Sequence, residues 1–430
     1  MTLIIPVWIY FVIFIILMLI NAPISFSMMV PAALYCIVEG VNFSMFANVM
    51  GNAFASWTML AIPTFIFVGS SMNSLGFSED IFKFAKALVG HVTGGLAHAN
   101  ILASMIFAGM SGSSIADAGG LGQIEVKAMV DAGYDDGFSA AVTSTSAGIG
   151  PIIPPSISFV IYGSMASVSI IALFMAGFLP GIIMGIALMI MCYFMCRKNT
   201  KLAPKTKKEN WRNVFKYGLR ALPSLGAPVL LIGGMLSGVF TTTEAGVVAS
   251  VYVVILAVIY KRFKLKSIVE TLKSSLHTTT MVLFMMGAGQ IFNWFITTSG
   301  LMKSMLNGLL LLQSKFLVLL VLDGILLFMG CFMGGSSILI LMTPFLISLS
   351  NSLGLDLLHL GVVLVLTTMI GGTTPPMAPA LFTTCKCCSI KFENALKPAL
   401  LLLVPLFVTL LILTYIPEVV LVIPKLFGVY

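Results

Sequence analysis

The chain has 430 residues, of which 59% are hydrophobic and only 9% are charged. A soluble domain carries roughly 25% charged residues, so this composition excludes a soluble protein and predicts one that crosses a membrane many times. Each crossing needs about 20 residues, so the length allows roughly ten to twelve crossings in contact with lipid, plus shorter re-entrant pieces. The net charge of +8 does not indicate a nucleic-acid partner, because the basic residues cluster between apolar segments.

The first apolar segment is predicted to be a membrane helix rather than a cleavable signal. Met1–Tyr10 contains no basic residue ahead of the apolar stretch, and no small-residue cleavage site follows it. A secretory signal would carry both features. We therefore interpret Pro6–Ile20 as part of the first membrane helix.

Two pairs of interruptions in the apolar sequence echo each other. The first pair is Ser111–Ser114, made of Ser and Gly, followed by Ile149–Pro155, which ends in a double proline. The second pair is Gly334–Ser337, followed by Ile370–Pro376, which also ends in a double proline. Irregular backbone survives at membrane depth only where protein or a wet cavity covers it. Paired Gly/Pro interruptions in two halves of a chain therefore indicate a transporter binding site.

The spacing of these landmarks indicates an internal duplication. From Ser113 to Pro154 is 41 positions, and from Ser336 to Pro375 is 39 positions. The spacing alone leaves open whether the two repeats are parallel or inverted. Every segment should be helical, because a sheet with open edges is not viable in lipid.

The expected organisation has two repeats joined by a polar linker. The first repeat covers 1–196, with a hairpin near 101–121 and a broken helix near 136–165. The linker covers 197–220. The second repeat covers 221–430, with a hairpin near 322–350 and a broken helix near 360–385.

Two clusters of basic residues lie in the middle of the chain. The first, Arg197–Arg220, is the only strongly polar linker, and the second is Lys261–Lys266. Short basic loops stay on the cytoplasmic side of a membrane. Two apolar spans, near Leu222–Phe240 and Ala245–Tyr260, separate the clusters, so both clusters can lie on that side.

A broken membrane helix exposes groups that bind ions. Unwound turns present carbonyl oxygens, and the C-terminal end of a half-helix carries partial negative charge, so both can coordinate Na⁺. Ser and Thr hydroxyls add ligands without burying a formal charge. The alternative is that Gly and Ser only allow close helix packing. We favour an ion and substrate site, because the interruptions are paired across two halves and include double prolines.

An ordered set of motifs runs through the chain. They are Leu60–Pro63, Leu88–His91, Gly94–Ala97, Ile101–Leu121, Ile149–Ser156, Tyr162-Gly163, Thr242–Gly246 and Pro375-Pro376. Together they resemble the large membrane (permease, M) subunit of tripartite ATP-independent periplasmic (TRAP) transporters. Each motif alone is weak, but the ordered set is specific and covers essentially the whole chain.

The resemblance implies an all-α polytopic membrane protein with two inverted structural repeats, re-entrant helical hairpins and broken helices. These would form a scaffold plus an elevator-type transport domain. The implied function is Na⁺-coupled secondary active import of an organic acid anion, of the sialic acid or C4-dicarboxylate class, across the bacterial inner membrane. Two or more Na⁺ ions are expected, with no organic cofactor. A periplasmic substrate-binding (P) protein would deliver the acid, and a small four-helix membrane (Q) subunit would be a separate chain.

Carried onto matching positions, the resemblance implies two sodium sites and a substrate region between the two hairpin tips. The first sodium site would use Ser111, Gly150, Ile153 and Pro155, and the second would use Gly330, Gly371, Thr374 and Met377. The substrate region would use Ser113, Ser114, Ser156, Ser336, Ser337 and Thr373. Ile153, Pro155 and Met377 could contribute only backbone carbonyls.

The second half departs from the family pattern at two places. Many relatives carry an acidic residue where Gly334 stands, and Leu-Thr-Pro-Pro-Val-Gly where this chain has Thr373–Ala378. Thr374 is retained, so a sodium site is still expected. The altered surroundings leave the substrate class open.

Three other features have two interpretations each. Asp117 is either a functional intramembrane acid or a local cap. Glu244 follows three Thr residues, which favours a role at a helix N-terminus. Cys385, Cys387 and Cys388 could ligate a metal, but a fourth ligand is missing, which favours packing at a helix end.

Two alternatives to a three-protein importer are considered. A stand-alone Na⁺/carboxylate symporter would need no binding protein. A membrane-embedded enzyme is disfavoured, because the four His are scattered and the sequence contains no Ser-x-x-Lys or His-Glu-x-x-His motif. ATP hydrolysis within the chain is not expected, since no Gly-x-x-x-x-Gly-Lys-Ser/Thr pattern occurs.

Overall fold

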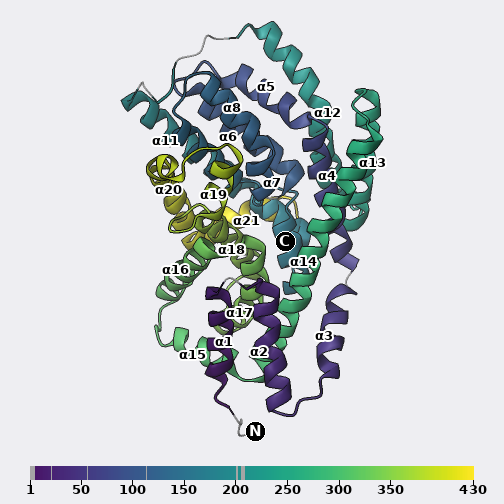
Figure 1. The fold of residues 1–430 in the computed structure, drawn as a ribbon, viewed down its shortest axis with the longest axis vertical. Coiled ribbons are helices and arrows are strands. Elements are labelled where there is room, and N and C mark those ends of the chain that lie inside the picture. Colours follow the sequence, from purple (N-terminus) through teal and green to yellow (C-terminus); the bar gives the residue numbers. More distant parts are fainter. Residues whose placement is uncertain (1–4, 21, 56, 113, 200–201, 205–208) are drawn as a thin grey trace.

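The computed structural model describes residues 5–20, 22–55, 57–112, 114–199, 202–204 and 209–430, with the backbone alone described at 111, 115, 116 and 119. Within these residues every regular element is a helix, and no strand occurs (Figure 1). The all-α expectation is confirmed. Its physical reason is that a helix satisfies its own backbone polar groups in lipid.

Seven of the described helices are long and apolar enough to span a membrane, or up to eight spans if a bent helix pair is counted as one. These candidates are fewer than the crossings that the length allows, and five further apolar helices of 10–17 residues in the described part of the chain are too short to cross alone, as expected for shorter re-entrant or broken pieces. The seven are α11 (Ile170–Lys198), α12 (Trp211–Leu236), α13 (Thr242–Ile259), α14 (Leu265–Thr298), α16 (Lys315–Phe332), α17 (Gly335–Leu353) and α20 (Phe392–Tyr415).

The first half contains one hairpin and one broken helix. The arms of the hairpin are α6 on one side and α7 with α8 on the other, so it extends beyond the expected 101–121. The broken helix consists of α9 and α10, separated by the non-helical residues 148–156. The elements before α11 are α1 (Val7–Leu19), α2 (Ile24–Val38), α3 (Ser44–Phe54), the 3₁₀ turn η1 (Trp57–Leu60), α4 (Ala61–Ser74), α5 (Phe77–Val89), α6 (Gly95–Ser111), α7 (Ser114–Gly119), α8 (Leu121–Asp131), α9 (Asp136–Ala147) and α10 (Ile157–Ala166).

The second half repeats this order. Its hairpin is α16 and α17, and its broken helix consists of α18 and α19, separated by residues 372–378. The linker between the halves is shorter than 197–220, because α11 continues to Lys198 and α12 begins at Trp211. The remaining elements are α15 (Leu301–Leu310), α18 (Leu357–Gly371), α19 (Pro379–Cys387) and α21 (Pro417–Leu426).

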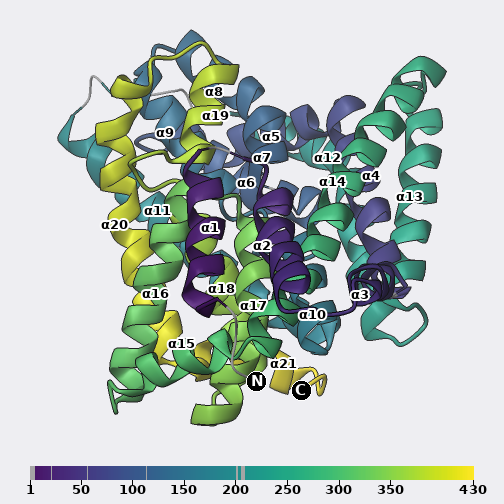
Figure 2. The ribbon, with the colours of Figure 1, turned by 60° about the horizontal axis from the view of Figure 1, so that its bottom comes forward.

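The two broken helices run in opposite directions through the molecule. Figure 2 shows α9 on the same side as α19, although α9 is the first part of its broken helix and α19 is the second part of its own. Helix α5 lies on that side as well, whereas its counterpart α15 lies on the opposite side. Both follow a left-handed glycine, Gly76 with φ 75° and Gly300 with φ 78°, where a side chain would be strained. The halves are therefore inverted repeats.

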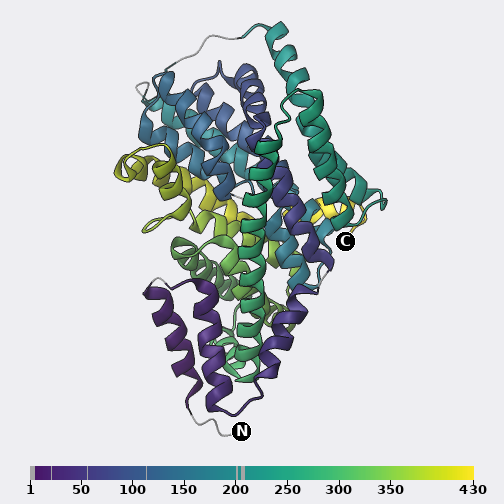
Figure 3. The same ribbon diagram turned by 45° about the vertical axis from the view of Figure 1, so that its right-hand side comes forward.

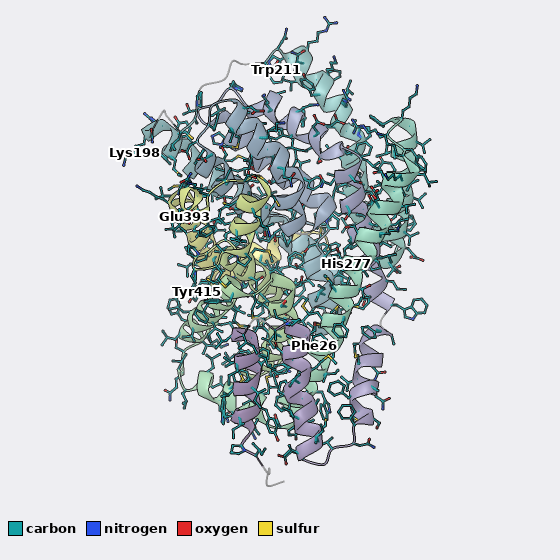
Figure 4. All side chains as sticks on the ribbon, in the orientation of Figure 1. Phe26, Lys198, Trp211, His277, Glu393 and Tyr415 are labelled. Carbon is teal, nitrogen blue, oxygen red and sulfur yellow. The ribbon has the colours of Figure 1, made fainter. Side chains whose placement is uncertain are left out.

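The two ends of the basic linker lie on one side of the molecule. Lys198 and Trp211, which flank it, both lie in the upper part of the molecule (Figure 4). Helix α5, which is on the side of α9 and α19 in Figure 2, lies in the upper part as well (Figure 1). Short basic loops usually remain cytoplasmic, so we expect this side to face the cytoplasm.

The two repeats interlock at the centre. Within each repeat the first hairpin arm packs on the first part of the broken helix, α6 on α9 and α16 on α18. Between repeats, α7 packs on α19 and α10 packs on α17. The long helix α14 runs past this centre, with α2, α3 and α4 packed along it (Figure 3). This arrangement brings the two hairpin tips and the two breaks into one region.

An ion cluster holds α5 against α12 and the end of α13. The Asp80 side chain is 2% exposed, and its Oδ2 lies 2.6 Å from Arg262 Nη2 while its Oδ1 lies 3.1 Å from Arg220 Nε. The Arg262 guanidinium also lies 4.8 Å from the centre of the Phe77 ring. Because α5 leads into α6, the cluster anchors the base of the first hairpin.

Candidate functional site

The tip of the first hairpin lies against the first break. At Gly112, which is left-handed with φ 59°, a Cβ atom would lie 3.0 Å from both Pro155 O and Ile157 N. Ser111 is the last residue of α6, but its side chain lies outside the described atoms, and Ser113 lies wholly outside the described residues. The structure therefore brings the tip to the Pro155 carbonyl, one of the predicted sodium ligands.

Gly150 faces an acid from the returning arm of the hairpin. Asp117 is 2% exposed, and its Oδ2 occupies the space into which a side chain at Gly150 would point. Glu125 of α8 is also buried, and its Oε1 makes no hydrogen bond within the described residues. Asp117 thus lines the first break.

The remaining predicted residues of the first half have different surroundings. Ile153 is buried and fills the space beside Gly181 of α11. Ser156 is the N-cap of α10, where its hydroxyl accepts a hydrogen bond from Phe159 N at 3.2 Å and donates one to a carbonyl of the break. Ser114 begins α7 and is half-buried. Of these, Ser156 helps to hold the shape of the break itself.

The second hairpin meets the second break backbone to backbone. A Cβ atom at Gly330 would lie 2.7 Å from Gly371 Cα, and the reverse distance is the same. The Sγ of the next residue, Cys331, lies 3.4 Å from Pro375 O and 3.3 Å from Leu327 O, and these two carbonyls can share its one hydrogen. Gly330 and Gly371, two predicted sodium ligands on separate helices, are thus in contact. They can approach this closely because neither carries a side chain.

Hydroxyl groups line the start of the second break. Thr374 Oγ1 donates to Ile370 O at 2.8 Å, and Thr373 Oγ1 donates to the same carbonyl at 2.9 Å. A hydroxyl that donates its hydrogen still has lone pairs available for a cation. Met377 has its side chain 56% exposed, so its backbone carbonyl is the group that could contribute to a site.

The serines of the second tip lie in the first turn of α17. Ser337 is 7% exposed, and its Oγ lies 3.1 Å from Met285 Sδ of α14. Ser336 is half-buried. This side of the predicted substrate region therefore faces α14.

Both breaks present the same chemistry. The C-terminal ends of α9 and α18 supply carbonyl oxygens with partial negative charge, and nearby Ser and Thr supply hydroxyl oxygens. No Lys or Arg is among the predicted ligands. This arrangement suits a small, hard cation such as Na⁺, which prefers oxygen ligands.

Sequence reasoning did not select Asp323, which is 3% exposed on α16 and accepts hydrogen bonds from neighbouring helices. Its signal in the sequence was a single acid within the otherwise apolar run 316–330. An acid inside a membrane segment is a functional candidate by default.

Two other sequence predictions have structural outcomes. Glu244 forms a capping box with Thr241 at the start of α13, with Thr241 N 2.8 Å from Glu244 Oε2, so its predicted role at a helix N-terminus is confirmed. Cys385 is buried whereas Cys387 is exposed. Within the described part of the chain, no three His, Cys, Asp or Glu side chains are grouped in a way that could hold a metal ion.

A family model and individual relatives of known name point to the same family for this chain. Residues 11–419 match the model of the tripartite ATP-independent periplasmic transporter DctM component. The sialic acid TRAP transporter large permease protein SiaM of Vibrio cholerae is 42% identical over 95% of this chain and 96% of its own length. The sialic acid TRAP transporter permease protein SiaT of Haemophilus influenzae is 37% identical over 98% of this chain and 68% of its own length.

Two further proteins are similar to this chain, one in sequence and one in fold. The C4-dicarboxylate TRAP transporter large permease protein DctM of Pseudomonas aeruginosa is 34% identical over 86% of this chain and 87% of its own length. The YdaH transporter of Alcanivorax borkumensis superposes with a TM-score of 0.59 at 13% identity, over 86% of this chain and 87% of that chain. The latter likeness concerns the fold alone. From the family match and the membrane spans together, the chain belongs to the TRAP transporter family, as a large permease subunit of the inner membrane.

Proposed function

We propose that this subunit imports an organic acid anion by Na⁺-coupled secondary active transport. The main support is that each hairpin closely approaches the break of its own repeat. Gly112, at the first tip, lies against Pro155, and Gly330, in the first arm of the second hairpin, lies against Gly371. Carbonyl and hydroxyl oxygens at two such places suit Na⁺, and a central site between inverted repeats suits alternating exposure to two sides. The Na⁺ gradient and the membrane potential supply the energy.

Sialic acid is the first candidate substrate, and C4-dicarboxylates are the second. The relatives with 42% and 37% identity carry sialic acid in their names, whereas two relatives named for C4-dicarboxylates are 34% and 32% identical. The hydroxyl groups of Ser337 and Thr373 could donate to or accept from either acid. The acid itself is proposed to lie between the two tips.

The subunit is proposed to work with two partners, a periplasmic substrate-binding protein and a small membrane subunit. The family description as a tripartite periplasmic transporter supports this arrangement. The test is uptake into proteoliposomes that contain this subunit and the small subunit, with and without the binding protein. We expect accumulation of labelled sialic acid only with an inward Na⁺ gradient and the binding protein. Equal uptake in K⁺ alone would contradict Na⁺ coupling, and full uptake by this chain alone would favour a stand-alone symporter.

The movement is proposed to be an elevator, in which the hairpins and broken helices slide past α14 and its neighbours. The contact between Ser337 and Met285 offers a test, because it joins α17 to α14. In a background without native cysteines, the pair Ser337→Cys and Met285→Cys should cross-link on oxidation. We expect oxidation to stop uptake and reduction to restore it, and the reduced double variant is the reference against which the loss is measured. Full uptake by the cross-linked protein would contradict an elevator movement.

A further inference from the structure

A buried carboxylate joins three helices of the second repeat. Asp323 lies on α16, and its Oδ1 is 3.4 Å from Thr367 Oγ1 of α18. Its Oδ2 is 2.8 Å from Thr414 Oγ1 of α20. All three side chains are at most 3% exposed. Asp323 therefore lies inside the helix packing and away from the lipid face.

The first repeat has a matching contact made by an amide. Asn100 stands 13 positions before Ser113, as Asp323 stands 13 positions before Ser336. In the broken helices, Ser146 stands eight positions before Pro154, and Thr367 stands eight positions before Pro375. Counting from the hairpin tip therefore aligns Asn100 with Asp323, and counting from the double proline aligns Ser146 with Thr367.

The contact in the first repeat is fully satisfied. Ser146 Oγ donates to Asn100 Oδ1 at 2.9 Å, and Asn100 Nδ2 donates to Thr143 Oγ1 at 2.6 Å. The amide therefore both accepts and donates between α6 and α9. An ionised carboxylate could only accept, whereas a protonated carboxylic acid can accept at one oxygen and donate from the other.

The hydrogen atoms available around Asp323 decide between these two forms. Thr367 Oγ1 lies 2.7 Å from Val363 O and 3.4 Å from Asp323 Oδ1, and it has one hydrogen to give. The nearer carbonyl is the better acceptor of that hydrogen, so only a weak, shared hydrogen bond reaches Asp323 Oδ1 across 3.4 Å. A proton on Asp323 Oδ1 gives this contact a hydrogen of its own. Thr414 donates to the other oxygen, so every group is then satisfied.

No ion pair that involves Asp323 occurs among the described residues. In the described part of the chain the ion pairs are Lys83 with Glu79 and the two arginines with Asp80, all distant in sequence from α16. The titratable groups on the packed helices are Glu393, Lys397 and Tyr415 of α20 and His359 of α18, with Asp356 and Glu418 at the starts of α18 and α21 (Figure 4 labels Glu393 and Tyr415). Glu393 and Lys397 lie at the opposite end of α20 from Thr414, and Lys315 lies at the start of α16, eight positions before Asp323. Tyr415 donates to Phe316 O at 3.1 Å, and a His359 ring nitrogen lies 2.8 Å from Leu413 O. Burying a charge without a partner is strongly unfavourable.

We propose that Asp323 holds a proton at neutral pH, so that its carboxylic acid does in the second repeat what the Asn100 amide does in the first. The proton stays bound through the transport cycle and is not a coupling ion. Its role is to keep α16 joined to α18 by a neutral contact, so that Gly330 and Gly371, further along the same helices, remain in register. Asp323 is thus a positioning residue that binds a proton.

The direct test is infrared spectroscopy of the purified full-length protein in lipid at neutral pH. A protonated carboxylic acid has a carbonyl band separate from that of a carboxylate. We expect the variant Asp323→Asn to lose one such band. Because Asp117 and Glu125 are also buried, only the band removed by this substitution is assigned to Asp323.

A second variant provides a test that does not depend on whether Asp323→Asn folds. Thr414→Val removes the hydroxyl that donates to Oδ2, so the Asp323 carbonyl band should shift to higher frequency and not disappear. A spectrum in which neither variant changes the acid band would overturn the proposal, because Asp323 would then be ionised.

The effect on function is measured as uptake into proteoliposomes that contain this subunit and the small subunit, with the binding protein present. Asp323→Asn should keep uptake and its Na⁺ dependence within about twofold of the parent, because Asn copies the first repeat. At alkaline pH the parent should lose uptake reversibly as Asp323 releases its proton, and the Asn variant should not show this loss. A tenfold or greater loss in the Asn variant at neutral pH, with normal thermal stability, would show that the ionised form is required. Since the parent is the reference, a parent without Na⁺ dependence would instead contradict the proposed function.

Discussion

Gly330 of α16 and Gly371 of α18 touch backbone to backbone, at a point where a Cβ atom on either residue would lie 2.7 Å from the Cα atom of the other. The contact joins the second hairpin to the second break. It also places two predicted sodium ligands side by side, although they stand 41 positions apart in the sequence.

Gly330→Ala should separate this pair and weaken the second site. Overpacking of a tight contact typically costs roughly 1–3 kcal/mol, and here the obstacle is backbone that cannot turn aside. We expect a lower melting temperature and at least a tenfold loss of Na⁺-dependent uptake. Gly324→Ala on the same helix is the control, because a Cβ there meets nothing within 4 Å. Normal uptake by the Gly330 variant would exclude a tight sodium site at this contact.

Thr374→Val should impair sodium coupling. A hydrogen bond or ligand to a charged group contributes roughly 1.5–3 kcal/mol, so the half-saturating Na⁺ concentration for uptake should rise about tenfold or more. Thr383→Val of α19 is the matched control, since both hydroxyls donate to the carbonyl four residues earlier at 2.8 Å. If the two variants respond equally to Na⁺, Thr374 is not a ligand.

Asp80→Ala should destabilise the base of the first hairpin. The substitution leaves Arg262 with its charge partly buried and without its partner, and breaking a buried pair costs about 3 kcal/mol. The measurement is thermal unfolding in detergent, together with uptake. If the melting temperature falls no further than it does when an exposed ion pair is removed, the cluster does not anchor α5.

Glu79→Gln on the same helix provides that exposed pair. Its partner Lys83 lies 2.7 Å away, and the hydrogen bond from Lys83 lowers the pKa of the Glu79 carboxyl. A lowered pKa in the folded state means that the pair stabilises the protein at neutral pH and that this contribution is lost as the pH falls through that value. Because both side chains are about half exposed, we expect little change in melting temperature from this variant.

Cys387 should report which side of the membrane α19 occupies. It is exposed, whereas Cys385 is 2% exposed and Cys192 and Cys196 are buried. A membrane-impermeant maleimide should therefore label inside-out vesicles, and Cys387→Ser should remove most of the label. Labelling of intact cells from the outside would contradict the cytoplasmic placement of α19.

Much of the fold could be predicted from the sequence. Composition excluded a soluble protein, since so few charges cannot cover a water-facing surface. The double prolines and glycines marked where helices end, because proline lacks an amide hydrogen and glycine lacks a side chain. The sequence could not divide full spans from shorter pieces, because short helices such as Leu357–Gly371 are as apolar as full spans.

The sequence did not reveal how the helices before the two hairpins, α5 and α15, are held in place. Asp80 shows why the sequence could not resolve this. Its partners Arg220 and Arg262 lie well over a hundred positions away, and only folding brings them to the same carboxylate.

The sequence by itself determined that the protein is a membrane protein with two related halves, because hydropathy and spacing are properties of the chain alone. The tertiary structure decided that the halves are inverted, that Asp117 faces Gly150, and that Asp323 meets Thr367 and Thr414. These relationships depend on how separate helices pack, and local residue patterns do not encode the direction or the partner of a distant helix.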